Sequence, residues 1–166
     1  MKDQLAEEIG WFNSKNSLAH ITINEFMASE KQIEFIKKEL ILICDSIKPV
    51  AVSLKTFGTY PNGAFFLAPD EITKPELKSI LQYVNQAFNT NTRFKNSEPH
   101  LSIARKLSPE KIEKAYRLFP SAVALNFICD SITLRCYNPD VKQFEIVSSF
   151  PFNNNPDSFY GQGTLF

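Results

Sequence analysis

Residues 15–23 read KNSLAHITI, and residues 95–103 read KNSEPHLSI. Both stretches begin with Lys-Asn-Ser and carry a histidine at the sixth position. His20 and His100 are the two histidines of the chain, and they lie 80 residues apart. Such self-similarity is typical of a chain built from two copies of one structural unit.

A second pair of segments follows the same register. Residues 52–55 read VSLK, and residues 132–135, again 80 positions further on, read ITLR. Two separate matches at one offset indicate an internal duplication in which each half carries one histidine.

The apolar periodicity and the turn residues predict the same order of elements in both halves. The first half is expected to contain a helix at 3–13, a strand at 20–26, a helix at 30–45, and strands at 50–57 and 64–68. The second half should contain a helix at 75–89, a strand at 100–105, a helix at 108–118, and strands at 127–137 and 142–150. We therefore predict an α+β fold of two pseudo-symmetric lobes, with antiparallel sheets facing a central cleft and helices outside.

This order also defines the expected domain boundaries. Residues 1–150 should form a single bilobal domain, whose lobes are the repeats at about 3–68 and 75–150. Residues 151–166 are rich in Asn, Gly and Ser, and we expect a loosely ordered tail whose aromatic residues could dock on the body.

Composition limits the classes of protein to which the chain can belong. The chain has 166 residues, of which 43% are hydrophobic, enough for the core of one ordinary domain. Lys and Arg total 18, as do Asp and Glu, so the chain lacks the positive field of a protein that coats long nucleic acid. No apolar run approaches the roughly 20 residues of a membrane helix, and no signal peptide is visible at the N-terminus. We expect a cytoplasmic protein.

Strand alternation predicts which side chains share the cleft surface. In each histidine strand the imidazole and the hydroxyl two residues later lie on one face, and the aliphatic residues lie on the other. The expected cleft residues are His20, Thr22, His100, Ser102, Lys55, Phe57, Arg135 and Tyr137. Cations bind phosphate oxygens and aromatic faces stack on bases, so this set is typical of a nucleotide site.

A lone histidine on a strand is usually an ordinary surface residue. Here both histidines occupy equivalent positions of a repeat, each followed by a hydroxyl, which favours a functional role. No Asp, Glu or Cys recurs where it could complete a set of metal ligands, so we expect no metal and no cofactor.

The two motifs, HITI at 20–23 and HLSI at 100–103, resemble the paired H-Φ-[ST]-Φ signature of the 2H phosphoesterase superfamily, where Φ is hydrophobic. The stretch PHLSIAR at 99–105 is similar to the PH[LI]T[LI]xR form of its 2′-5′ RNA ligase (LigT-like) branch. The resemblance spans about residues 3–150.

This resemblance implies a bilobal fold and metal-free chemistry on 2′,3′-cyclic phosphates or 2′-5′ linkages of nucleotides or RNA ends. His20 and His100 would act as acid and base, and Thr22 and Ser102 would donate to phosphoryl oxygens. Arg105 also fits the family pattern, although strict alternation places it on the core side of its strand.

The sequence departs from the family pattern at its start. In such proteins a strand precedes the first helix, as residues 63–69 do in the second half, but the chain begins almost at its first helix. We expect a free sheet edge in the first lobe, covered by the tail or by another subunit.

Three functions remain open at the level of the sequence. The first is a phosphoesterase with a nucleotide or an RNA end as its substrate, and the second is a binding module that uses the same cleft without turnover. The third is a structural protein with incidental histidines, which would keep the two imidazoles apart. The sequence assigns neither histidine as the base and leaves the oligomeric state open.

Overall fold

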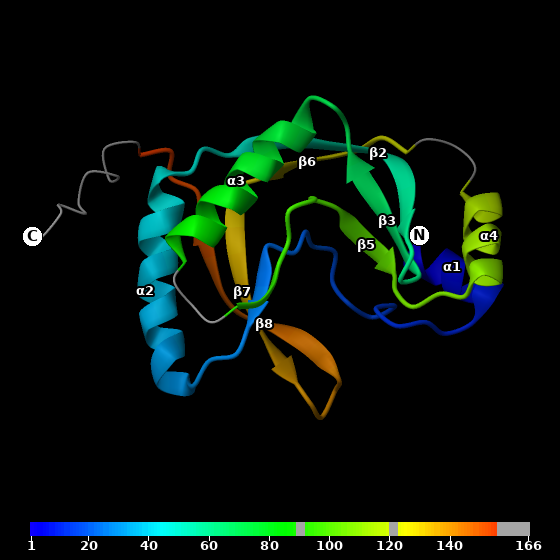
Figure 1. Cartoon of the computed structure of the whole chain (residues 1–166), viewed down its shortest axis with the longest axis horizontal. Helices are drawn as coiled ribbons and strands as arrows, with labels where there is room; N and C mark the ends of the chain where they lie inside the picture. Colours follow the sequence, from blue (N-terminus) through cyan, green and yellow to red (C-terminus); the bar gives the residue numbers. More distant parts are fainter. Residues whose placement is uncertain (89–91, 120–122, 156–166) are drawn as a thin grey trace, which may run out of the picture.

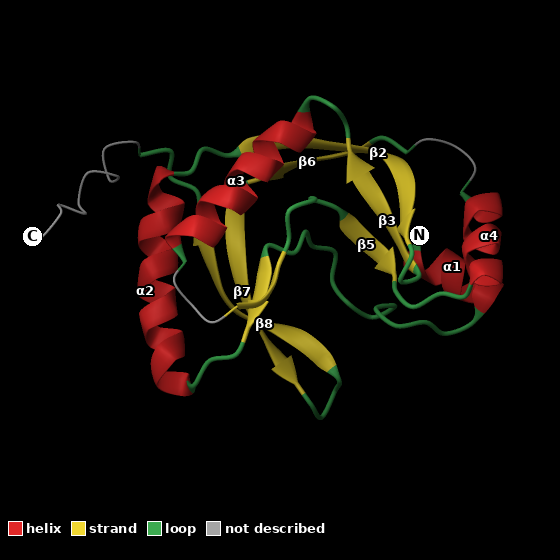
Figure 2. Ribbon diagram, in the orientation of Figure 1, coloured by secondary structure: helices red, strands yellow, loops and turns green. Residues whose placement is uncertain are grey.

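The structure, a computed structural model, describes residues 1–88, 92–119 and 123–155 (Figure 1). Along these ranges the elements are α1 (Lys2–Ile9), β1 (Asn24–Phe26), α2 (Glu30–Ser46), β2 (Val50–Tyr60), β3 (Ala64–Pro69), α3 (Thr73–Ala87), β4 (Thr92–Lys95), β5 (Leu101–Ala104), α4 (Pro109–Leu118), β6 (Leu125–Cys129), β7 (Ser131–Asn138) and β8 (Gln143–Pro151). All strand pairs are antiparallel. The expected α+β fold, with curled antiparallel sheets and outer helices, is confirmed (Figure 2).

Local sequence signals explain where the helices begin. Ser29 and Gln32 form a capping box at the start of α2, with the Ser29 N–H donating to Gln32 Oε1 at 2.8 Å. Ser108 caps α4 and accepts a hydrogen bond from the Lys111 N–H, and Pro109 fills the first helical turn.

A four-stranded sheet supports one end of the molecule, with strand order β5-β3-β2-β6. β3 lies in its middle, between β2 and the strand that follows His100, and nearly all of its side chains are buried. Two smaller sheets pair β7 with β8 and β1 with β4. The predicted strand at 127–137 is therefore divided at Asp130, where the chain passes from the large sheet to the β7–β8 pair.

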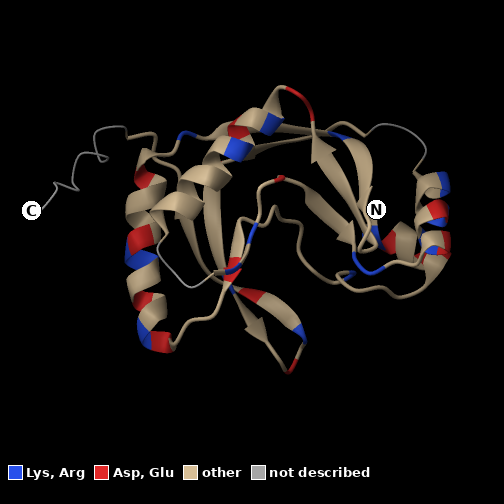
Figure 3. Ribbon diagram, in the orientation of Figure 1, with Lys and Arg blue, Asp and Glu red and all other residues tan. Residues whose placement is uncertain are grey.

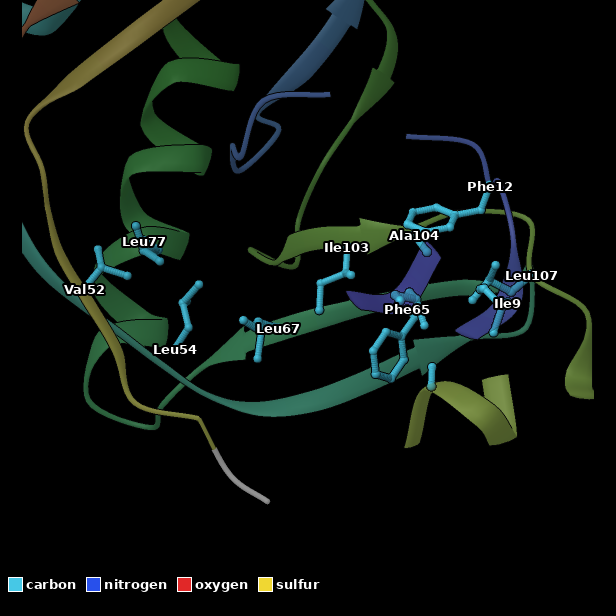
Figure 4. Packing of buried hydrophobic residues seen from close by; sticks show 12 residues of the cluster. Ile9, Phe12, Val52, Leu54, Phe65, Leu67, Leu77, Ile103, Ala104 and Leu107 are labelled. Atoms are coloured by element: carbon cyan, nitrogen blue, oxygen red, sulfur yellow. The ribbon is translucent and has the colours of Figure 1, made fainter. Parts of the chain in front are cut away.

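The described residues form two hydrophobic cores, and each draws on both halves of the sequence. The first core contains Leu5, Ile9, Phe12, Val52, Leu54, Phe65, Leu67, Leu77, Ile103, Ala104, Leu107 and Ala115 (Figure 4). The second contains Ile36, Leu40, Ile43, Cys44, Ile47, Val84, Phe88, Ile132, Leu134, Phe150 and Phe152. From the sequence we expect repeat 3–68 to form one lobe and repeat 75–150 the other, but each core contains residues of both repeats. The reason is topological: β5 of the second half pairs with β3 of the first, and α2 of the first half packs on β7 and β8 of the second.

The sequence predicts a free sheet edge because no strand precedes the first helix. Residues 2–9 form helix α1, so no strand is built from residues 1–6. Within the described ranges, β7 and β8 pair with each other alone. The predicted strand at 20–26 is reduced to a bridge at Ile21 and to the short β1, which pairs with β4.

The beginning of the tail is held against α2. Phe152 is buried in the second core, and the Asn153 side chain donates to Asp45 Oδ1 at 2.8 Å. The Asn154 and Asn155 N–H groups donate to the carbonyls of Ile47 and Asp45. The expected loose tail begins at residue 151, and its part from 156 to 166 lies outside the described residues. No helix of the described chain is long and apolar enough to cross a membrane.

Candidate active site

An antiparallel bridge between Ile21 and Leu101 brings the two histidine motifs face to face. In antiparallel pairing the residues that flank a bridged pair lie opposite each other, so His20 faces Ser102 and Thr22 faces His100. All four side chains alternate away from the bridged pair and line one cavity of about 1820 Å³. Directly opposed residues have Cβ atoms about 4.5–5.5 Å apart and diagonal ones about 7–8 Å, so one phosphate can lie within reach of both imidazoles.

Both imidazoles are oriented by the same kind of hydrogen bond, from Nδ1 to a backbone carbonyl. His20 Nδ1 lies 2.6 Å from the Leu18 carbonyl oxygen, and His100 Nδ1 lies 2.8 Å from the Glu98 carbonyl oxygen. A carbonyl can only accept, so each Nδ1 carries a proton and donates it to the residue two positions earlier. The remaining nitrogen, Nε2, is then the group that each ring offers to a ligand.

Asn96 links the two motifs. Its buried side chain donates from Nδ2 to the Thr22 carbonyl at 2.7 Å and accepts a hydrogen bond from the Glu98 N–H at 3.1 Å. Its backbone N–H donates to the Ile23 carbonyl at 2.8 Å. One residue therefore holds the first histidine segment against the approach to His100.

Three cations surround His20. Arg135 Nη1 lies 3.0 Å from His20 Nδ1, and Lys2 donates to the carbonyls of Ser14 and Ser17, just before His20 in the chain. Burial lowers the pKa of His20 most, and the charges of Arg135, Arg105 and Lys2 lower it further, against the opposing effect of the Leu18 carbonyl. The lowered pKa favours the neutral form of His20, which is the form that can accept a proton.

The family model of the 2′-5′ RNA ligase superfamily matches residues 13–140. The chain belongs to the 2′-5′ RNA ligase superfamily. The match includes both histidine motifs, their hydroxyls and Arg135.

Two relatives illustrate how far the likeness extends. A Bacillus cytotoxicus protein with a provisional phosphoesterase name is 33% identical over 92 residues, which are 54% of this chain and 52% of that protein. The chain thus spans about half the length of this curated relative. The crystal structure of TT0787 of Thermus thermophilus has a TM-score of 0.57 and 13% identity, and the match covers 92% of this chain and 87% of that one. At this identity the likeness shows the fold alone.

The possible substrate-binding residues of this superfamily member fall into two groups. Arg135, Tyr137 and Arg105 line the cavity together with the two motifs. For Arg105 the strand ends at Ala104, so the alternation that would have turned this side chain toward the core no longer applies, and the residue is exposed.

Lys55 and Phe57 do not reach the cavity, and a β-bulge in β2 explains why. Leu54 pairs with Pro69 and Thr56 with Ala68, so Lys55 is the extra residue of the bulge. A bulge shifts the alternation of the strand beyond it by one position. Lys55 forms an ion pair with Asp70 at 2.8 Å instead.

Beyond the bulge, Phe57 turns inward and stacks on Phe65 and Phe119 at 5.3 and 5.5 Å between ring centroids. In the second hairpin the irregularity lies on β8, where Val147 is the extra residue, so the alternation of β7 is intact. Arg135 and Tyr137 therefore keep the orientation that the sequence predicts.

Tyr60 and Lys2 are among the cavity residues that sequence reasoning missed. Tyr60, the last residue of β2, lines the cavity, and its ring centroid lies 5.3 Å from that of His100. Lys2 opens the first helix and lies far from either motif in sequence. The shifted alternation conceals Tyr60, and no sequence signal marks Lys2, because its place depends on how α1 packs.

Proposed function

We propose that this chain is a metal-independent phosphoesterase that hydrolyses 2′,3′-cyclic phosphates of nucleotides or RNA ends, or related 2′-5′ linkages. The observation that carries the proposal is the bridge between Ile21 and Leu101, which sets two identically oriented imidazoles and two hydroxyls around one space. Family membership supports phosphodiester chemistry of this kind.

In the proposed reaction, water attacks the phosphorus while His20 Nε2 takes its proton. The bond from phosphorus to one ribose oxygen breaks, and protonated His100 gives its proton to that oxygen. The lowered pKa of His20 suits it to the role of base. Thr22 and Ser102 would donate to the non-bridging oxygens, with Arg135 stabilising their charge.

A turnover assay with a 2′,3′-cyclic nucleotide tests the proposal. His20→Ala and His100→Ala should each lower kcat by about 10²–10⁴-fold, the usual effect of a positioned acid or base. The double variant should be little slower than the slower single variant, because both groups act in one transition state. Thr22→Ala and Ser102→Ala should cost less, since each removes one hydrogen bond among several.

Two further measurements can contradict the proposal. Among the described residues, no three His, Cys, Asp or Glu side chains gather as a metal site, so EDTA should leave the rate unchanged. Loss of activity in EDTA and its return with zinc or manganese would make the histidines metal ligands. Binding of a cyclic nucleotide without any turnover would instead support the binding module.

A further inference from the structure

The guanidinium of Arg135 has more donors than acceptors around it. Its Nη2 donates to the Phe144 carbonyl, but its buried Nε has no hydrogen-bond partner within the described part of the chain. Its Nη1 faces His20 Nδ1, which already donates to the Leu18 carbonyl and so cannot accept. A ligand cannot reach the buried Nε, but the guanidinium lines the cavity with a positive charge that can balance an anion there.

Two more cations reach the same cavity. The Lys2 ammonium is fixed by the carbonyls of Ser14 and Ser17, at 2.9 and 2.7 Å, which leaves its third N–H for a ligand. Arg105 lies where β5 ends, bridged to Asn13 on the loop that Lys2 also holds. The three cations contact one segment, residues 13–20: Arg105 is bridged to Asn13, Lys2 binds Ser14 and Ser17, and Arg135 lies at His20. Burial lowers the pKa of Lys2 most, and the charges of Arg105 and Arg135 lower it further.

These cations have no carboxylate within ion-pair distance in the ranges that the structure describes. The outer helices α2 and α4 differ, because they carry charges of both signs along their length (Figure 3). Examples are Lys37 with Glu34 on α2 and Lys114 with Glu110 on α4. The positive charge of the cavity is therefore left for a ligand.

We propose that Lys2 and Arg105 form a subsite for a second phosphate of the substrate, next to the phosphate that lies between the two histidines and beside Arg135. A cyclic phosphodiester carries a single negative charge, which three cations exceed. A substrate with a further phosphate, either an internucleotide diester or a 5′-monoester, would supply the missing charge and acceptors. This inference rests on the proposed function and names the substrate class of the same site.

Steady-state kinetics with three substrates test the subsite. These are adenosine 2′,3′-cyclic phosphate, its 5′-phosphorylated form, and a dinucleotide that ends in a 2′,3′-cyclic phosphate. We expect kcat/KM to rise about ten- to a hundredfold with the second phosphate, the effect of charge-assisted hydrogen bonds. The two bisphosphorylated substrates show whether a monoester or a diester is preferred.

Variants assign the gain to its residues. Lys2→Met and Arg105→Gln should bring the ratio of kcat/KM between substrates with two phosphates and one close to unity, and Lys2→Arg should retain much of it. Lys31→Met, an exposed lysine on α2, should leave the ratio unchanged. If Lys2 only anchored the loop at Ser14 and Ser17, Lys2→Met would lower kcat/KM equally for all three substrates. That result would overturn the inference.

A binding measurement separates this inference from the proposed function. By calorimetry, adenosine 3′,5′-bisphosphate should bind more tightly than adenosine 3′-monophosphate, and the difference should be lost in Lys2→Met and Arg105→Gln. Such a difference in affinity without any turnover would support the subsite and contradict the proposed catalytic function. Turnover without any preference for a second phosphate overturns the subsite and keeps the enzyme.

Discussion

At the scale of single residues, the two histidines differ although their motifs repeat. His20 lies beside the cation Arg135, whereas His100 packs against the rings of Tyr60 and Phe66, at 5.3 and 4.9 Å between centroids. A near-symmetric frame thus gives its two imidazoles different surroundings, as an acid and a base require. The sequence predicts the pair and its hydroxyls, but this asymmetry arises from residues distant in the chain.

The charge of Arg135 should be visible in the pH dependence of activity. Arg135 lowers the pKa of His20, so Arg135→Met should raise this pKa toward its ordinary value of about 6.5. Because a base must be neutral, the acid limb of the kcat/KM profile should then move to higher pH. The shift should be partial, since burial is the larger cause of the lowered pKa.

Lys55→Met is the matched control, because Lys55 holds the equivalent position of the repeat but pairs with Asp70 outside the cavity. Its acid limb should coincide with that of the unchanged protein. An acid limb that stays in place in Arg135→Met would show that His20 is not the group whose titration limits the rate.

Asn96 should contribute to stability as well as to geometry. Asn96→Ala leaves the Thr22 carbonyl and the Glu98 N–H without their partner, so the free energy of unfolding should fall by about 1–3 kcal/mol. Urea denaturation measures this loss. Asn16 is its counterpart in the repeat and is exposed, so Asn16→Ala should change stability by less than about 0.5 kcal/mol. Equal effects in the two variants would contradict the linking role of Asn96.

At the scale of elements, the helices and hairpins follow from the sequence, but the bulges do not. Capping residues, prolines and apolar spacing predict α2, α3 and α4 to within a few residues, and the turn at Tyr60–Gly63 is as expected. A bulge leaves no clear mark in one sequence, because it depends on how two strands align. For this reason Arg135 and Tyr137 line the cavity, whereas Lys55 and Phe57 do not.

The β2–β3 turn should be intolerant of any side chain at Gly63. This residue has φ of +79°, and an added Cβ would lie against the backbone of Leu107, whose N–H donates to the Gly63 carbonyl. Gly63→Ala should destabilise the protein by more than the roughly 1–2 kcal/mol of left-handed strain alone. Gly63→Asn tests the cause, because Asn tolerates this conformation but still has a Cβ. If Gly63→Asn is nearly as stable as the unchanged protein, the contact with Leu107 is not limiting.

At the scale of the whole molecule, the two cores cannot be separated by cutting the chain once. α1, β2 and β3 of the first half share a core with β5 and α4 of the second, while α2 packs with β7 and β8. Sequence periodicity identifies the buried faces, but it does not say which faces meet. That choice depends on strand pairing between distant segments, which a single sequence does not record.

The shared connectivity should make unfolding a single transition. Leu54→Ala in the first core and Ile36→Ala in the second should each cost about 2–5 kcal/mol and lower the same Tm. Calorimetry should give equal calorimetric and van't Hoff enthalpies. Two resolved transitions, each sensitive to one of these substitutions, would show that the cores fold independently.

Because each core contains residues from both halves of the chain, the order of synthesis also matters during translation. The buried residues of the first core end at Ala115, whereas the β7–β8 sheet that covers α2 begins at Ser131 and its last buried neighbour is Phe152. At the usual rate of about 5–20 residues per second, α2 waits on the order of 5–20 s after its own synthesis for this sheet. Throughout that interval the β7–β8 sheet does not yet cover the apolar residues Ile36, Leu40 and Ile43 of α2. On the nascent chain these side chains are accessible to chaperones and to other nascent chains.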